Sequence, residues 1–159
     1  MAPDWNWKRK RRLRLAGRIL FLLYLAALVY FMFFADCYGH RIGGHEDYRA
    51  NLRLFREIRR FWRSREHLGF RAVFLNLACN VAGFLPFGFF LPVVSERLTG
   101  FFSVTIQGAL FSLLIESVQL VTRSGVFDVD DLVLNTAGAA FGWLLFFAAD
   151  RIRRRMYGI

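Results

Sequence analysis

A chain of 159 residues is long enough for one domain, and a composition that is 56% hydrophobic, with 19 Phe and three Pro, is too apolar for an ordinary soluble one. The net charge of +10 does not indicate a nucleic-acid partner, because the basic residues cluster beside long uncharged runs, as they do where a membrane protein meets cytoplasm and anionic lipid. Two cysteines exclude a disulfide framework.

Four apolar runs follow one another along the chain, at about 19–35, 72–94, 100–121 and 132–149. The third run contains Glu116, and the other three contain no charged residue. Crossing a ~30 Å hydrocarbon layer takes roughly 20 residues, which all four runs provide, the shorter two only just. A soluble core could explain one such run but hardly four, so the sequence predicts an all-α, polytopic membrane protein with four transmembrane helices.

The ends of the chain predict its orientation in the plasma (inner) membrane. We expect a basic cytoplasmic N-terminus at 1–18, a four-span membrane domain at 19–149 and a basic cytoplasmic tail at 150–159. Four spans place both termini on one side together with the short turn at 95–99, and that side carries twelve Lys and Arg against ten on the other. Basic residues directly beside a span weigh most, so both termini are predicted to be cytoplasmic.

The connection between the first two spans shows helical periodicity at about 47–65. Tyr48, Leu52 and Phe55 recur on one side of this segment, and arginines recur on the other. This pattern predicts one amphipathic helix in the membrane plane, either as a lipid-anchored strut or with direct contacts to headgroup phosphates. The candidates for headgroup contact are Arg49, Arg53, Arg56 and Arg60.

Polar residues inside the spans recur at helical spacing. Asn76 and Asn80 lie one turn apart in the second span. In the third, Ser112, Glu116, Gln119 and Arg123 follow at spacings of four, three and four, which places them on one helical face. The turn that follows holds Asp128, Asp130 and Asp131, and Asn135 and Gly138 continue the face of Asp131 on the fourth span.

These polar residues are predicted to meet at one membrane face. Short turns make consecutive spans antiparallel, so the start of the second span, the end of the third and the start of the fourth lie together. A carboxyl group within a span is costly in lipid and should face protein or water. We therefore expect an extracytoplasmic-facing, polar and acidic pocket with these ligand-binding candidates: Asn76, Asn80, Glu116, Gln119, Arg123, Asp128, Asp130, Asp131 and Asn135.

The run IESVQLVTRSGVFDVDDLVLNTAG resembles the VanZ-like family, whose pattern is IE-x-x-Q, an Arg or similar, FD-x-DD and LN-x-x-G. A second similarity is Asn76 and Asn80 followed by FLPFGFFLP, and the resemblance covers roughly 47–149. One departure is NLRLF, where Asn51 matches but the family's usual proline is absent. The family takes its name from a protein associated with teicoplanin resistance, which implies a role in the cell envelope and in antibiotic resistance but no particular reaction.

Three functions remain open at this point. The protein could bind a membrane lipid, a lipid-linked cell-wall precursor or a glycopeptide, and so alter teicoplanin susceptibility. It could instead be an enzyme acting on a lipid headgroup, with Glu116 and Asp131 as catalytic candidates; the aspartates 128, 130 and 131 would then be the candidates for holding a divalent cation. Otherwise the polar faces lock a purely structural four-helix bundle. We expect no other cofactor, and no nucleophile–base pair is evident.

Overall fold

The computed structural model describes residues 5–34, 50–55, 59 and 70–157. These residues contain four long helices, α1 (Trp5–Phe34), α4 (Phe70–Val94), α5 (Phe101–Thr122) and α6 (Val129–Tyr157). Each of the four is long and apolar enough to cross a membrane, over Leu15–Phe33, Leu77–Val94, Phe101–Thr122 and Val129–Met156. The prediction of an all-α protein with four potential transmembrane helices is confirmed.

The first and last helices extend well beyond their apolar runs. Helix α1 begins at Trp5, so it includes the basic residues that precede the first span, and α6 continues to Tyr157 through the basic tail. In that tail Asp150 accepts hydrogen bonds from Arg153 Nη2 at 2.5 Å and Arg154 Nε at 2.6 Å. Pairs at these spacings support an exposed helix. Charged residues therefore mark the end of the span but not the end of the helix.

Helices α4 and α6 pack with their backbones in close approach. A Cβ atom on Gly142 would lie 2.0 Å from the carbonyl oxygen of Leu85, and one on Gly138 would lie 2.3 Å from that of Val81. In the opposite direction, a Cβ on Gly88 of α4 would lie 1.9 Å from the carbonyl oxygen of Ala139. Small residues at such positions allow helices in lipid to gain dispersion contacts along their whole length.

Aromatic side chains fill the space between the helices. Phe84 and Phe87 of α4 are buried, and the Phe87 ring stacks on Phe111 of α5 with centroids 5.5 Å apart. Helix α1 joins through Phe21, which packs on Phe87, and through Tyr24, whose hydroxyl donates to the carbonyl oxygen of Gly83 at 2.5 Å. The outward faces remain apolar and exposed, as a lipid-facing surface requires.

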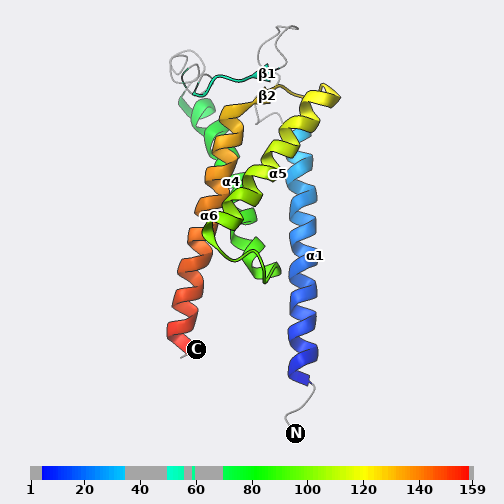
Figure 1. The fold of residues 1–159 in the computed structure, drawn as a ribbon, viewed down its shortest axis with the longest axis vertical. Helices are drawn as coiled ribbons and strands as arrows, with labels where there is room; N and C mark the ends of the chain where they lie inside the picture. The colour runs from blue at the N-terminus through cyan, green and yellow to red at the C-terminus, as the bar shows by residue number, and fades with distance from the viewer. Residues whose placement is uncertain (1–4, 35–49, 56–58, 60–69, 158–159) are drawn as a thin grey trace.

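Two short strands lie at one end of the bundle, opposite the start of α1 and the end of α6 (Figure 1). Strand β1 (Ala50–Asn51) pairs in parallel with β2 (Phe127–Asp128), with Asn51 opposite Asp128. The N-terminal part of the interfacial helix predicted at about 47–65 is therefore wrong, since Ala50 and Asn51 are extended and a turn with a positive φ at Phe55 follows. Helical spacing of apolar residues cannot reveal a backbone pairing across the chain.

An interfacial helix is not shown in the part of 47–65 that the structure describes. Arg59 is helical, and its amide donates to the carbonyl oxygen of Phe55 at 3.0 Å. Arg53 is exposed in the turn after β1. The other candidates for headgroup contact, Arg49, Arg56 and Arg60, lie outside the described residues.

Candidate functional site

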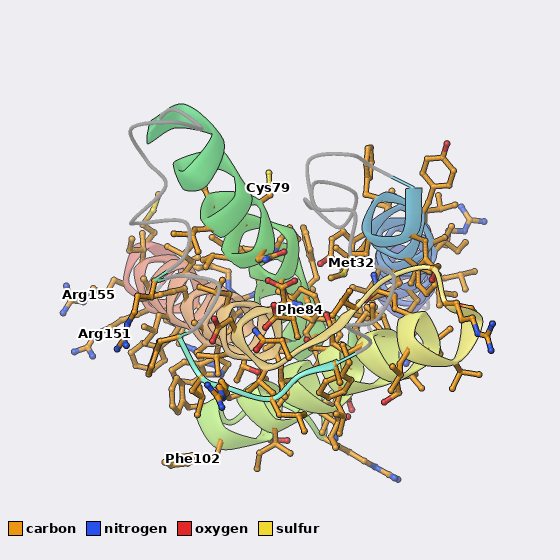
Figure 2. All side chains as sticks on the ribbon, turned by 90° about the horizontal axis from the view of Figure 1, so that it is seen from above. Met32, Cys79, Phe84, Phe102, Arg151 and Arg155 are labelled. Atoms are coloured by element: carbon orange, nitrogen blue, oxygen red, sulfur yellow. The ribbon has the colours of Figure 1, made fainter. Side chains whose placement is uncertain are left out.

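Polar side chains from both strands and from three helices are buried together at the strand end of the bundle. Between 0% and 9% of each residue is exposed. We call this set the polar cluster; its members are Asn51, Asn80, Ser112, Glu116, Gln119, Asp128, Asp130, Asp131 and Asn135. Figure 2 looks along the bundle, with Phe84 in the middle and Met32 toward α1. The predicted meeting of polar residues at one end is thereby observed.

Asp128 lies at the centre of the hydrogen bonds that link β1, β2 and α5. Its amide donates to Glu116 Oε2 at 2.9 Å, so the acid of α5 holds the backbone at the start of α6. Its carboxylate accepts from Asn51 Nδ2 at 3.2 Å and 3.3 Å, and from the amide of Asp130 at 2.8 Å. The last of these bonds caps the first turn of α6, where an acidic side chain also favours the helix dipole.

The segment after β1 is fastened to the same turn. The amide of Phe55 donates to Asp130 Oδ1, and the amide of Arg53 donates to the side-chain oxygen of Asn51 at 3.4 Å. Phe55 has φ 61°, a left-handed conformation that a bulky residue seldom adopts without such support. The 50–55 segment, which we call the strap, therefore lies across the end of the polar cluster.

Three amide side chains join helices deeper in the bundle. Asn80 of α4 donates to Asp131 Oδ1 of α6 at 2.6 Å. Asn135 of α6 donates to Ser112 Oγ of α5 at 2.9 Å. Gln119 of α5 donates to the carbonyl oxygen of Met32 at 3.0 Å, which ties the end of α1 to the cluster.

Four buried oxygen atoms of the polar cluster accept no hydrogen bond from the residues that the structure describes. They are Asn80 Oδ1, Glu116 Oε1, Gln119 Oε1 and Asn135 Oδ1, which we call the four unpaired oxygens. A buried polar atom without a partner is destabilising by about 1–3 kcal/mol. Four such oxygens in one cluster therefore oppose folding unless a further group donates hydrogen bonds to them.

Two residues with a predicted ligand-binding role are not placed in the polar cluster. Helix α5 ends at Thr122, and Arg123 follows as a left-handed C-cap with φ 57°, exposed at the surface. The helical face predicted for Arg123 is therefore not formed, because the helix ends one residue before it. Asn76 lies on α4, but its side chain is outside the described part of the chain.

Two members of the polar cluster are absent from the predicted binding set. Ser112 shares the face of Glu116, which was its signal in the sequence, and its hydroxyl is bonded to Asn135. Asn51 reaches Asp128 across 77 residues. Its match to the VanZ-like pattern was the only signal for it, since nothing in the spacing predicts the strand pairing.

The three aspartates proposed to hold a divalent cation are engaged separately. Asp128 accepts from Asn51, Asp130 from the amide of Phe55, and Asp131 from Asn80. Among the described residues, no group of three or more His, Cys, Asp or Glu side chains is arranged to hold a metal ion.

A surface depression of about 350 Å³ lies at the other end of α6 and is lined by Phe147, Asp150, Arg151 and Arg154. It is remote from the polar cluster, so it is not the predicted acidic pocket. At the cluster, the strap and the helix ends surround carboxylate and amide oxygens that are turned away from bulk solvent. Chemically, this arrangement offers hydrogen-bond acceptors to a buried partner.

The comparisons with known proteins agree with this architecture. A family model described as VanZ/LLP1 matches residues 21–150, which include the C-terminal part of α1, all of α4 and α5, and the polar cluster. The comparisons with curated proteins and with solved structures found no significant match. Since the family model matches well over half of the chain, this protein belongs to the VanZ/LLP1 family.

Proposed function

We propose that this protein binds a lipid-linked or other polar component of the cell envelope in its polar cluster, and that it thereby influences susceptibility to teicoplanin and related glycopeptides. The observation that carries the proposal is the set of four unpaired oxygens. A purely structural joint would be expected to satisfy its buried polar atoms, because each one left without a partner opposes folding. A bound headgroup would supply the missing donors.

The proposed orientation places the polar cluster on the extracytoplasmic side of the plasma membrane. The start of α1 and the end of α6 lie at the same end of the bundle, opposite the strands (Figure 1). Both of these helix ends are rich in Lys and Arg, including the exposed Arg151 and Arg155. Basic residues beside membrane spans favour the cytoplasm, so the termini face inward and an envelope component reaches the cluster from outside.

The strap gives the proposed site a contact for phosphate. Arg53 is exposed in the turn after β1, two residues from Asn51 of the polar cluster. A guanidinium at this position would meet the phosphate of a lipid whose headgroup enters the cluster. We extend this role, as a proposal, to the arginines 49, 56 and 60.

The structural function stays as the second candidate because a specific observation favours it. The hydrogen bonds from Asn80 to Asp131, from Asn135 to Ser112 and from Gln119 to Met32 each join two different helices. Amide side chains in membrane helices commonly serve this purpose. The binding function and the structural function predict different phenotypes when one carboxyl group is replaced by an amide of the same shape.

The test is the pair of variants Glu116→Gln and Asp131→Asn, expressed in cells in which the wild-type protein alters teicoplanin susceptibility. Each amide keeps an oxygen that can accept the existing bond, from Asp128 N–H or from Asn80, so both variants should fold and insert. If the cluster binds a ligand, both should lose the phenotype at wild-type surface expression.

The matched control is Glu96→Gln, the same exchange at an exposed acid in the turn between α4 and α5. It should keep the wild-type phenotype. Folded and inserted Glu116→Gln and Asp131→Asn variants with wild-type susceptibility would reject the binding function and leave the structural one.

A further inference from the structure

The four unpaired oxygens share one chemistry, because with Glu116 ionised and the amides oriented as in the structure all of them accept hydrogen bonds. Two of them are fixed by the other end of their own amide group. Asn80 must turn its nitrogen toward the carboxylate of Asp131, and Gln119 must turn its nitrogen toward the carbonyl oxygen of Met32. Turning either amide group over would point its oxygen at another acceptor and break the buried hydrogen bond. The two amide oxygens therefore face away from Asp131 and from the Met32 carbonyl.

Glu116 adds an acid to this set. Its Oε2 accepts from the amide of Asp128, which leaves Oε1 free to accept a second donor. Gln119 lies three residues further along α5, one turn away on the same face. Glu116, Gln119, Asn80 and Asn135 are each 0–1% exposed, so a group that reaches these oxygens must leave bulk water.

This chemistry discriminates among the polar groups that a headgroup can carry. A phosphate is an acceptor with a negative charge, and it would meet Glu116 and the amide oxygens without a donor. A sugar hydroxyl can donate once, but its own lone pairs would need donors that the unpaired oxygens do not offer. A primary ammonium carries three N–H donors, no acceptor and a positive charge, and it matches an acceptor set made of one carboxylate and several amide oxygens.

The geometry points to a primary ammonium group as the part of the envelope component that enters the polar cluster. This inference rests on the proposed function and names the chemistry of its ligand. Glu116 Oε1 takes the charge-assisted hydrogen bond, and two of the three unpaired amide oxygens, those of Asn80, Gln119 and Asn135, take the remaining two N–H groups. The ammonium can belong to an aminolipid or to a soluble amine, and the experiment separates these sources.

The probes are ethanolamine and a short-chain phosphatidylethanolamine, added to the full-length protein purified in detergent. Their controls are choline and the matching phosphatidylcholine, which keep the positive charge but carry no N–H donor. We expect a saturable rise in Tm with the N–H-bearing probes and none with their trimethylated counterparts. A rise in Tm with both ethanolamine and phosphatidylethanolamine shows that the ammonium group alone is enough for binding. A rise with phosphatidylethanolamine but not with ethanolamine shows that the ligand is an aminolipid.

Three results would overturn the inference: equal shifts in Tm with the choline compounds, no shift with any probe, or a shift with magnesium chloride alone.

Glu116→Gln provides the matched test within the protein. Its amide oxygen can still accept from Asp128, but its NH₂ then occupies the place of an acceptor. Affinity for phosphatidylethanolamine should fall on the order of tenfold or more, while the Tm of the unliganded protein should not fall, because an unpaired acceptor has been removed.

Glu96→Gln is the control and should bind like wild type. If Glu116→Gln does not fold, Gln119→Met replaces it. This change removes another unpaired oxygen at nearly constant volume, together with the hydrogen bond to the Met32 carbonyl, and should weaken binding in the same direction. Wild-type affinity in a folded Glu116→Gln or Gln119→Met protein would overturn the inference.

Native mass spectrometry of protein released from cell membranes distinguishes failure of the inference from failure of the proposed function. An amine-bearing component that wild type retains and Glu116→Gln releases supports both. A retained component that depends on Glu116 but lacks a primary amine overturns the ammonium inference alone. If no component depends on Glu116, both proposals fall.

Discussion

Replacing Gly142 by alanine tests the close contact between α4 and α6. The new Cβ would lie 2.0 Å from the carbonyl oxygen of Leu85, about 1.4 Å inside the 3.4 Å at which ordinary van der Waals contact begins. Because the obstacle is backbone, the helices must separate or shift. Overpacking of this kind destabilises by about 1–3 kcal/mol, against a gain of up to about 1 kcal/mol from the better helix propensity of alanine.

The assay is thermal unfolding of the purified protein in detergent. At about 2–4 °C per kcal/mol for a chain of this size, the overpacking corresponds to a loss of about 2–12 °C in Tm, against a propensity gain of up to about 4 °C that Gly17→Ala shares. Gly17→Ala is the matched control, since it also lies within a helix but its Cβ would be 3.9 Å from the nearest atom, Val94 Cγ1. Equal Tm values for the two variants would refute the close-packing account.

Three further predictions concern the polar cluster and the orientation. The bond from Asn135 to Ser112 should give a coupling energy of about 0.5–1.5 kcal/mol in a double-mutant cycle with Asn135→Leu and Ser112→Ala, and additive effects would contradict it. Asn51→Asp should lower the Tm more than Asn51→Ala, because it places a second carboxylate against Asp128; the reverse order would show that this pair does not hold the strap. In an otherwise cysteine-free chain, Ser124→Cys should react with a membrane-impermeant thiol reagent in intact cells, and labelling only after permeabilisation would invert the proposed orientation.

The sequence predicted the parts of the fold that depend on local pattern. Apolar run length predicted four potential membrane helices, and short turns predicted which helix ends meet. Spacing along α5 placed Ser112, Glu116 and Gln119 on one face, and all three are buried there. The same spacing rule was wrong for Arg123. Helix α5 ends at Thr122 and Arg123 is its left-handed C-cap, so Arg123 does not continue the helical face.

The parts that the sequence did not predict depend on contacts between distant segments. Strand β1 has two residues, too few for any alternation of polar and apolar side chains, and its partner Asp128 lies 77 residues from Asn51. The apolar residues around it recur at helical spacing, which favoured an interfacial helix at a place where Ala50 and Asn51 are extended. The bond from Gln119 to the carbonyl oxygen of Met32 uses a backbone acceptor that no sequence pattern marks.

The most direct test of the central claim is an experimental density map of the wild-type protein purified with its native lipids. We expect non-protein density at roughly 3 Å from Glu116 Oε1 and from at least one amide oxygen among Asn80, Gln119 and Asn135. A map in which these four oxygens accept from protein groups or from isolated waters, with no ligand density between the strap and the helix ends, would contradict ligand binding by the polar cluster.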